Sequence, residues 1–218
     1  MKSSTDPGPL AKLQSDMECD ARAQIKQDLF VLKHLDGKEN GYFVEFGASD
    51  GKTLSNTWLL EKRFGWQGIL AEPSRHWHVS LRSNRSCSID TRCVWKTTGD
   101  LIQFHDTLDP FLSSPDKTTS PIISTYDVNT VALSDLLDCH SSPPCIDYLS
   151  VDTEGSELDI LQGFDKDKGF NRYRFNCITI EHNFNLPRRR AIMSVLAGHG
   201  YLNVHSMISE FDDWYVLR

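Results

Sequence analysis

Acidic side chains follow four short apolar segments of this chain. Residues 42–44 precede Glu45, residues 69–71 precede Glu72, residues 148–151 precede Asp152, and residues 178–180 precede Glu181. Short apolar segments bounded by turn residues are typical of strands buried on both faces of a parallel sheet. Because ligands bind beyond the carboxyl ends of such strands, this row of acids predicts a site for a ligand with hydroxyls, an ammonium group or a metal.

The segment from Glu45 to Gly51 (EFGASDG) joins a predicted strand to a predicted helix. Gly47 and Gly51 permit tight turns and close approach of a ligand to the backbone. Glu72 ends the next strand, where an acid can accept both ribose hydroxyls of a nucleoside. Ser49 replaces the middle glycine that a pyrophosphate requires, which argues against a nicotinamide oxidoreductase. S-adenosylmethionine has no phosphate, and its ammonium group suits Glu45. The structural alternative is that Glu45 and Asp50 only cap the turn.

A second group of polar residues follows the strands that end at Asp152 and Glu181. Ser156 and Glu157 suit the start of a helix, but this does not require Asp152 or Glu154. Neighbouring strands are about 5 Å apart, so Asp152 and the sequence Glu181-His182-Asn183 are expected to meet. Two interpretations stay open: Asp152, Glu181 and His182 hold a divalent cation (Mg²⁺ or Mn²⁺), or His182 is a general base without a metal. A capped loop is the structural alternative.

The bulk properties are those of an ordinary globular chain. At 218 residues with 39% hydrophobic content, it is long enough for one sizeable domain, predicted over residues 21–218 after a flexible lead-in over residues 1–20. A net charge of −7 argues against a nucleic-acid partner. The sequence shows no secretory signal and no apolar stretch near the roughly 20 residues of a membrane span, so we expect a cytoplasmic protein. Cys139 and Cys145 are interpreted as free thiols, with a disulfide as the alternative.

Strands and helices alternate along the chain, which predicts an α/β fold with a mainly parallel sheet. The last two strands lack an intervening helix and are predicted to pair antiparallel. Residues 101–105 are predicted to pair with the strand before them, and residues 107–127, rich in Ser, Thr, Asp and Pro, are predicted to be a loop. Helices are predicted over residues 21–35, 53–64, 75–82, 131–138 (or a turn), 157–164 and 187–198, and strands over residues 42–46, 68–71, 86–89, 93–96, 146–151, 177–180, 201–205 and 214–217.

Two sequence blocks together resemble the FkbM-type methyltransferases. They are YFVEFGASDG at residues 42–51, continued by LSNT, LE and GWQGILAEP up to Pro73, and IDYLSVDTEGSE at residues 146–157. The resemblance implies a class I methyltransferase (Rossmann-like) fold with seven strands, helices on both faces and an antiparallel last strand. It also implies S-adenosylmethionine as the cofactor. The residues expected to contact this cofactor are Glu45, Gly47, Ala48, Ser49, Asp50, Gly51, Asn56, Glu72, Pro73, Val94 and Asp152. Around Cys93-Val94 the sequence departs from the family, which tends to have Ala and a following acid there.

The resemblance implies methylation of a hydroxyl on a sugar or natural product, so the expected function is O-methylation of a small hydroxylated acceptor, with a sugar, glycoside or natural product as the expected class. Asp152, Glu181 and His182 are the expected catalytic residues, because a hydroxyl must lose its proton or have its developing charge stabilised. The alternative is a non-catalytic interaction domain that keeps the methyltransferase fold. Acids at every strand end argue against that alternative.

Overall fold

The computed structural model of the protein describes residues 19–115 and 119–218. All of the predicted lead-in except its last two residues lies outside this part of the chain. Within the described residues, no helix is both long enough and apolar enough to cross a bilayer. The six cysteines all lie within them and are free thiols, so the disulfide alternative for Cys139 and Cys145 is not realised.

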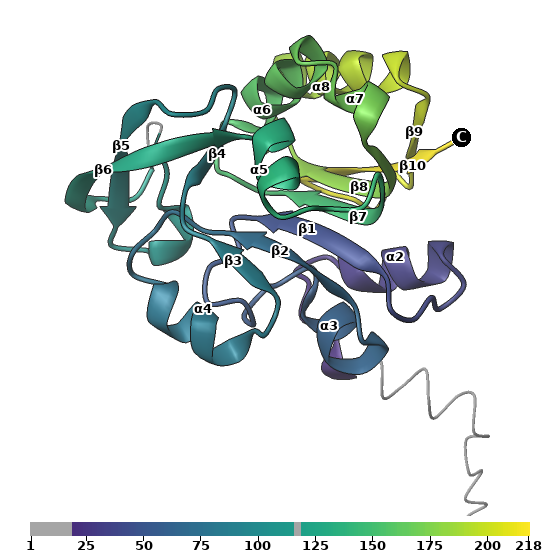
Figure 1. Ribbon diagram of the computed structural model, residues 1–218, viewed down its shortest axis with the longest axis horizontal. Helices are drawn as coiled ribbons and strands as arrows, with labels where there is room; N and C mark the ends of the chain where they lie inside the picture. The colour runs from purple at the N-terminus through teal and green to yellow at the C-terminus, as the bar shows by residue number, and fades with distance from the viewer. Residues whose placement is uncertain (1–18, 116–118) are drawn as a thin grey trace, which may run out of the picture.

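A seven-stranded sheet forms the centre of the molecule (Figure 1). Its strands are parallel except the last in the chain, which runs antiparallel to both of its neighbours. The predicted fold class is therefore confirmed, as is the antiparallel pairing of the last two strands. In spatial order the strands are β3 (Ser88–Asp90), β2 (Gln67–Ala71), β1 (Tyr42–Phe46), β7 (Cys145–Val151), β8 (Arg174–Glu181), β10 (Asp212–Leu217) and β9 (Tyr201–Val204).

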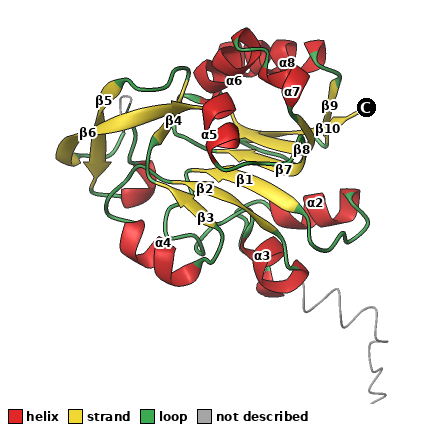
Figure 2. Cartoon of the chain, viewed as in Figure 1, coloured by secondary structure: helices red, strands yellow, loops and turns green. Residues whose placement is uncertain are grey.

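Helices cover both faces of this sheet (Figure 2). On one face lie α2 (Gln27–His34), α3 (Trp58–Phe64) and α4 (His78–Asn84). On the other lie α5 (Leu133–Cys139), α6 (Glu157–Lys166), α7 (Gly169–Arg172) and α8 (Leu186–Gly198).

Alternate residues of each strand pack into two separate apolar cores, one under each layer of helices. Phe43 and Tyr148 face α2 and α3, whereas Val44 and Leu149 face the α5–α8 layer. This period of two is the geometry of an extended strand.

A smaller sheet lies beside the first and joins β3 to α5. It consists of β4 (Cys93–Trp95), β6 (Ile122–Ala132) and β5 (Leu101–Thr107), with a 3-10 helix η1 (Pro110–Leu112) between β5 and β6. Two predictions are wrong here. Residues 122–127 form strand rather than loop, and β5 pairs with β6 instead of with β4. The first half of β6 is mostly exposed, so it lacks the apolar pattern that marks a buried strand.

Helices α2 and α3 begin later than the sequence predicts. The Asp28 carboxylate accepts hydrogen bonds from the backbone N–H groups of Arg22 and Ala23, at 3.0 and 3.4 Å, which holds those residues in a turn. Helix α3 begins at Trp58 instead of residue 53, because residues 47–57 form a longer connection after β1. That connection belongs to the site described next.

Candidate active site

A cavity of about 660 Å³ lies beyond the carboxyl ends of β1, β2, β7 and β8. The ends of these strands are level, because Phe46 pairs with Ala71 on one side and Val151 on the other. Each of the four predicted strand-end acids lines this cavity. The acidic lining residues are Glu45, Glu72, Asp109, Asp152, Glu154 and Glu181.

The strand-end acids share one face of the sheet. Phe43, Tyr148 and Cys177 pack toward the α2–α4 layer, and by alternation Glu45, Asp152 and Glu181 follow on that same face. The sheet therefore brings together side chains that are far apart in the sequence, and it aims them at one side of the cavity.

The turn after β1 approaches the neighbouring strand end closely. Gly47 has φ +71°, and a Cβ at this position would lie 1.9 Å from the backbone oxygen of Asp152. Only glycine fits this conformation and this gap. Gly51, with φ +74°, has its carbonyl oxygen bound by Arg85 Nη1 at 3.0 Å, and it does not line the cavity.

Glu45 is buried and its carboxylate is already engaged by the connection after β1. It accepts hydrogen bonds from Ser55 Oγ at 3.1 Å and from the backbone N–H of Asn56 at 2.8 Å, and also from the Thr57 hydroxyl. Arg85 Nη1 lies 3.8 Å from it. Burial raises the pKa of Glu45, and Arg85 opposes that shift. Glu45 thus fixes the loop that forms the cavity floor and also faces the cavity.

Glu72 also lines the cavity, at the end of β2. Its two oxygens accept hydrogen bonds from the backbone N–H groups of Ser49 at 2.7 Å and Ser74 at 2.8 Å. Burial raises the pKa of Glu72 to about 7 despite these bonds, and the negative charge of Asp106 adds to the shift. Near neutral pH the protonated and ionised forms of this carboxyl are therefore both populated, and a ligand can shift the balance between them.

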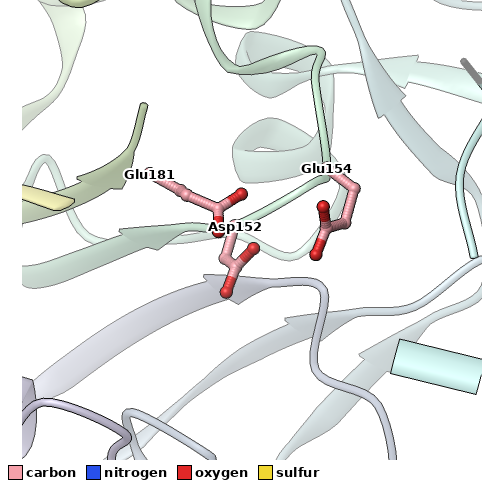
Figure 3. A group of neighbouring side chains, drawn as sticks. All are labelled: Asp152, Glu154 and Glu181. Atoms are coloured by element: carbon pink, nitrogen blue, oxygen red, sulfur yellow. The ribbon is translucent and has the colours of Figure 1, made fainter. Parts of the chain in front are cut away.

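Asp152, Glu154 and Glu181 form a carboxyl cluster at the ends of β7 and β8 (Figure 3). One oxygen from each lies within 4.8 Å of the others. Asn183 Nδ2 donates to Glu181 at 2.8 Å and lies 3.5 Å from Glu154. Burial raises the pKa of both Asp152 and Glu181, and repulsion from neighbouring carboxylates, Asp212 among them, raises it further. Such a cluster can accept a proton or bind a cation.

His182 does not join this cluster, in contrast to the prediction. It follows Glu181 and therefore faces the opposite side of the sheet, where its Nε2 lies 4.0 Å from Asp213 Oδ1. Its Nδ1 accepts a hydrogen bond from the backbone N–H of Phe184 at 3.1 Å. Burial lowers the pKa of His182, and the side chain does not line the cavity. Glu154 takes the third position of the candidate cation ligands instead.

The other residues expected at the cofactor divide into two groups. Asp50 does not line the cavity; its carboxylate accepts hydrogen bonds from the backbone N–H groups of Lys52 and Thr53, at 2.8 and 2.7 Å, so it caps the turn. The structure places the remaining ones in the cavity wall: Ala48, Ser49, Asn56, Pro73 and Val94.

Part of the cavity wall was not anticipated from the sequence. Trp77 and Phe111 line it as an aromatic pair, with ring centroids 5.1 Å apart. Phe111 belongs to η1, which follows Asp109, and both residues lie in the segment 107–127 that the sequence predicts as a loop. The apolar sequence Pro110-Phe111-Leu112, which lies between the polar residues Asp109 and Ser113, is the signal that marks this contact.

We compared the chain and its structure with known proteins. A search of curated proteins finds no match. Among solved structures, cofactor-bound Rv0187 from MTB is similar at 10% identity, over 100% of this chain and 93% of that one, with a TM-score of 0.51. The METTL16 MTase domain is similar at 11% identity, over 88% of this chain and 64% of that one, with a TM-score of 0.50. At such identities these likenesses establish the fold alone.

The family is established by the sequence itself. A family model described as the Methyltransferase FkbM domain matches residues 45–214. The match starts at Glu45, the first acid of the cavity, and extends to Trp214 on β10, so it includes every acidic residue that lines the cavity. The chain belongs to the FkbM methyltransferase family.

Proposed function

We propose that this protein transfers a methyl group from S-adenosylmethionine to a hydroxyl oxygen of a small acceptor, with a sugar, glycoside or natural product as the acceptor class. The observation that supports this most directly is the position of the carboxyl cluster. Asp152 is in backbone contact with Gly47, so the cofactor turn and the candidate proton acceptor meet at one point. Alignment of donor and acceptor in one cavity supplies much of the rate in such a displacement.

The residues have distinct roles in this proposal. The turn at residues 47–49 leaves room for the cofactor close to the protein backbone. Glu72 accepts hydrogen bonds from the ribose hydroxyls of the cofactor. Asp152 takes the proton of the acceptor hydroxyl, and burial together with the charge of Asp212 raises the Asp152 pKa so that this proton is held. Glu181, beside it, orients the hydroxyl. A general base works best when its pKa lies near the working pH. A nitrogen acceptor already has a lone pair at neutral pH and needs less of this apparatus.

The cavity also suggests which acceptors fit. Phe184 lines it beside Asn183 and exposes 68% of its surface, which offers an apolar face to a sugar ring or a similar scaffold. Six acids in the wall oppose an anionic acceptor, and this argues for a neutral small molecule over a nucleic acid.

The test uses radiolabelled methyl donor and pools of sugars, glycosides and other metabolites. We expect label in a product whose methyl group mass spectrometry locates on oxygen. Asp152→Asn keeps the shape of the side chain and removes its basicity, so this variant should bind cofactor and lose turnover. Turnover like that of the wild type in Asp152→Asn, or a methylated nitrogen in the product, would contradict the assignment. Absence of cofactor binding would favour the interaction-domain alternative.

A divalent cation at the carboxyl cluster is a second candidate for stabilising the developing alkoxide. It is favoured by the three carboxylate oxygens of Asp152, Glu154 and Glu181, which are the hard ligands that Mg²⁺ and Mn²⁺ prefer. If it is required, excess chelator abolishes turnover and either metal restores it. Activity that persists in chelator assigns the step to Asp152 alone.

A further inference from the structure

Among the described residues, the ionisable side chains that line the cavity are all carboxyl groups, apart from the Cys93 thiol. Six acidic residues line it, and no Lys, Arg or His does so within the described part of the chain. A cavity with such a wall focuses a negative potential on whatever occupies it. A positively charged ligand is therefore stabilised there, and the loss of that charge has a cost.

No cationic side chain among the described residues pairs with the carboxyl cluster. Asp152, Glu154 and Glu181 form no salt bridge among the described residues, and the Asn183 amide is the polar side chain that Glu154 and Glu181 share.

The nearby arginines are directed at other acids. Arg188 Nη1 contacts Glu157 at 3.4 Å, and Arg189 Nη2 contacts Asp213 at 2.7 Å. Arg85 contacts Glu61 at 2.6 Å and approaches only Glu45 among the cavity acids.

Asn56 provides an observation that is independent of the acids. Its side chain is 7% exposed and lines the same cavity, and its Nδ2 donates to Ser150 Oγ at 2.8 Å. Its Oδ1 has no hydrogen-bond partner among the described residues. A buried acceptor without a donor costs free energy until a ligand supplies one. The wall thus offers acceptors, charged and neutral, to a ligand that is cationic or rich in donors.

We infer that the cavity recognises its cofactor by positive charge, so that S-adenosylmethionine binds more tightly than S-adenosylhomocysteine. This inference rests on the proposed function. In the transfer the S–CH₃ bond breaks and its electron pair stays on sulfur, which becomes a neutral thioether. The O–CH₃ bond forms, and the hydroxyl proton moves to the Asp152 carboxylate. The cofactor therefore loses the positive charge of its sulfonium when the methyl group is transferred. Its attraction to the acidic residues of the cavity becomes weaker, which favours release of S-adenosylhomocysteine.

The experiment measures dissociation constants by calorimetry in buffer with chelator, so that no metal occupies the cluster. The ligands are S-adenosylmethionine, S-adenosylhomocysteine, and sinefungin, in which a protonated amine replaces the sulfonium. One unit charge near partly hydrated carboxylates should change affinity by about tenfold or more in favour of the two cationic ligands. ATP, which adds phosphates to the same nucleoside, should not compete.

Variants locate the effect. Glu181→Gln and Glu154→Gln should each reduce the preference for the cationic ligands several-fold, with little change for S-adenosylhomocysteine. Glu39→Gln is the matched control, because Glu39 is exposed and precedes β1, at the opposite edge of the sheet from the cavity. It should leave all affinities unchanged. Thermal melts confirm that each variant is folded.

The outcomes separate this inference from the proposed function. Binding of neither nucleoside overturns both. Binding of S-adenosylhomocysteine as tightly as S-adenosylmethionine overturns the inference and leaves the methyltransferase assignment in place. A preference for the cationic ligands that both Gln variants retain in full overturns the role of the carboxyl cluster.

Discussion

Gly47 and Asp152 are in close contact through their backbones, at the ends of two strands that are adjacent in space and far apart in sequence. A Cβ at Gly47 would lie 1.9 Å from the Asp152 oxygen, a distance that real atoms do not adopt. The cofactor turn and the proposed proton acceptor therefore cannot move independently.

The first prediction tests this contact. Gly47→Ala should destabilise the protein by more than about 3 kcal/mol and should lower turnover, because the new methyl group displaces the backbone at Asp152. Gly37→Ala is the control: Gly37 has φ +69°, against +71° for Gly47, but a Cβ at Gly37 would meet no atom within 4 Å. It should cost only about 1–2 kcal/mol of backbone strain. Equal losses in chemical denaturation for the two variants would contradict the steric argument.

The second prediction concerns Arg85, which is 5% exposed and ties the connection after β1 to α4. Although burial raises the pKa of Glu61, the Arg85 guanidinium and the hydrogen bonds from Lys62 and Ser86 together lower that pKa to about 2. Arg85→Met should destabilise the protein by about 3–5 kcal/mol, because it leaves Glu45 buried without a cationic partner and Glu61 with Lys62 alone.

The matched comparison for Arg85 is an exposed ion pair. The side chains of Arg172 and Asp138 are each 46% exposed, and they form a salt bridge at 2.8 Å. Arg172→Met should cost less than about 1 kcal/mol. Denaturant midpoints of the two variants, measured side by side, check the contrast; similar midpoints would show that the Arg85 network contributes little.

The third prediction is a pH dependence at Glu72, whose pKa burial raises from about 4.5 to about 7. The folded protein binds this proton more strongly than the unfolded chain, so its contribution to stability is complete below pH 4.5 and is lost as the pH rises through 7. The difference amounts to roughly 3 kcal/mol at most. Glu72→Gln should remove this part of the pH dependence of the free energy of unfolding. A wild-type slope in that variant would contradict it.

The same group should control cofactor affinity in the opposite direction. An ionised Glu72 is the better acceptor for ribose hydroxyls, so binding of S-adenosylmethionine should tighten as the pH rises from about 6 to about 8. Glu72→Gln should bind more weakly and with a flatter pH profile. Calorimetry across this range measures both effects.

The fourth prediction distinguishes the two candidate bases. His182→Gln keeps an acceptor for the Phe184 N–H, and His182 faces away from the cavity, so this variant should keep most of its turnover and an unchanged pH–rate profile. Asp152→Asn should lose turnover at every pH. A His182→Gln enzyme as inactive as Asp152→Asn, yet equally folded, would return His182 to the role of base.

The strand ends could be predicted because the sequence there carries two signals at once. Residues 42–46 and 146–151 are largely apolar and carry an acid at or just beyond their ends, which locates both the strand and the edge where ligands bind. The sequence also indicates which face of the sheet each strand residue occupies. Glu181 is an even number of positions from Cys177, whereas His182 is an odd number of positions from it. Side chains alternate along a strand, so this spacing alone places Glu181 and His182 on opposite faces of the sheet.

The remainder depended on contacts that a linear pattern does not encode. Strand β6 is largely exposed and contains Ser, Thr, Asp and Asn, so neither its pairing with β5 nor its length follows from hydrophobic periodicity. The late start of α2 follows from the hydrogen bonds of Asp28, a helix-interior acid by pattern alone. Phe111 reaches the cavity only because η1 folds back toward it.

The small sheet has a consequence for how such an enzyme could change. Four of the cavity acids lie at or just beyond the ends of strands of the central sheet, where substitution is costly, whereas Asp109 and Phe111 lie between β5 and β6, and the first half of β6 is mostly exposed. Substitutions are therefore less costly for stability in the part of the wall between β5 and β6 than at the ends of the central strands. Under the proposed function, variation between β5 and β6 would remodel the surroundings of the acceptor and leave the strand-end acids unchanged, so new acceptors would be acquired most readily through that hairpin.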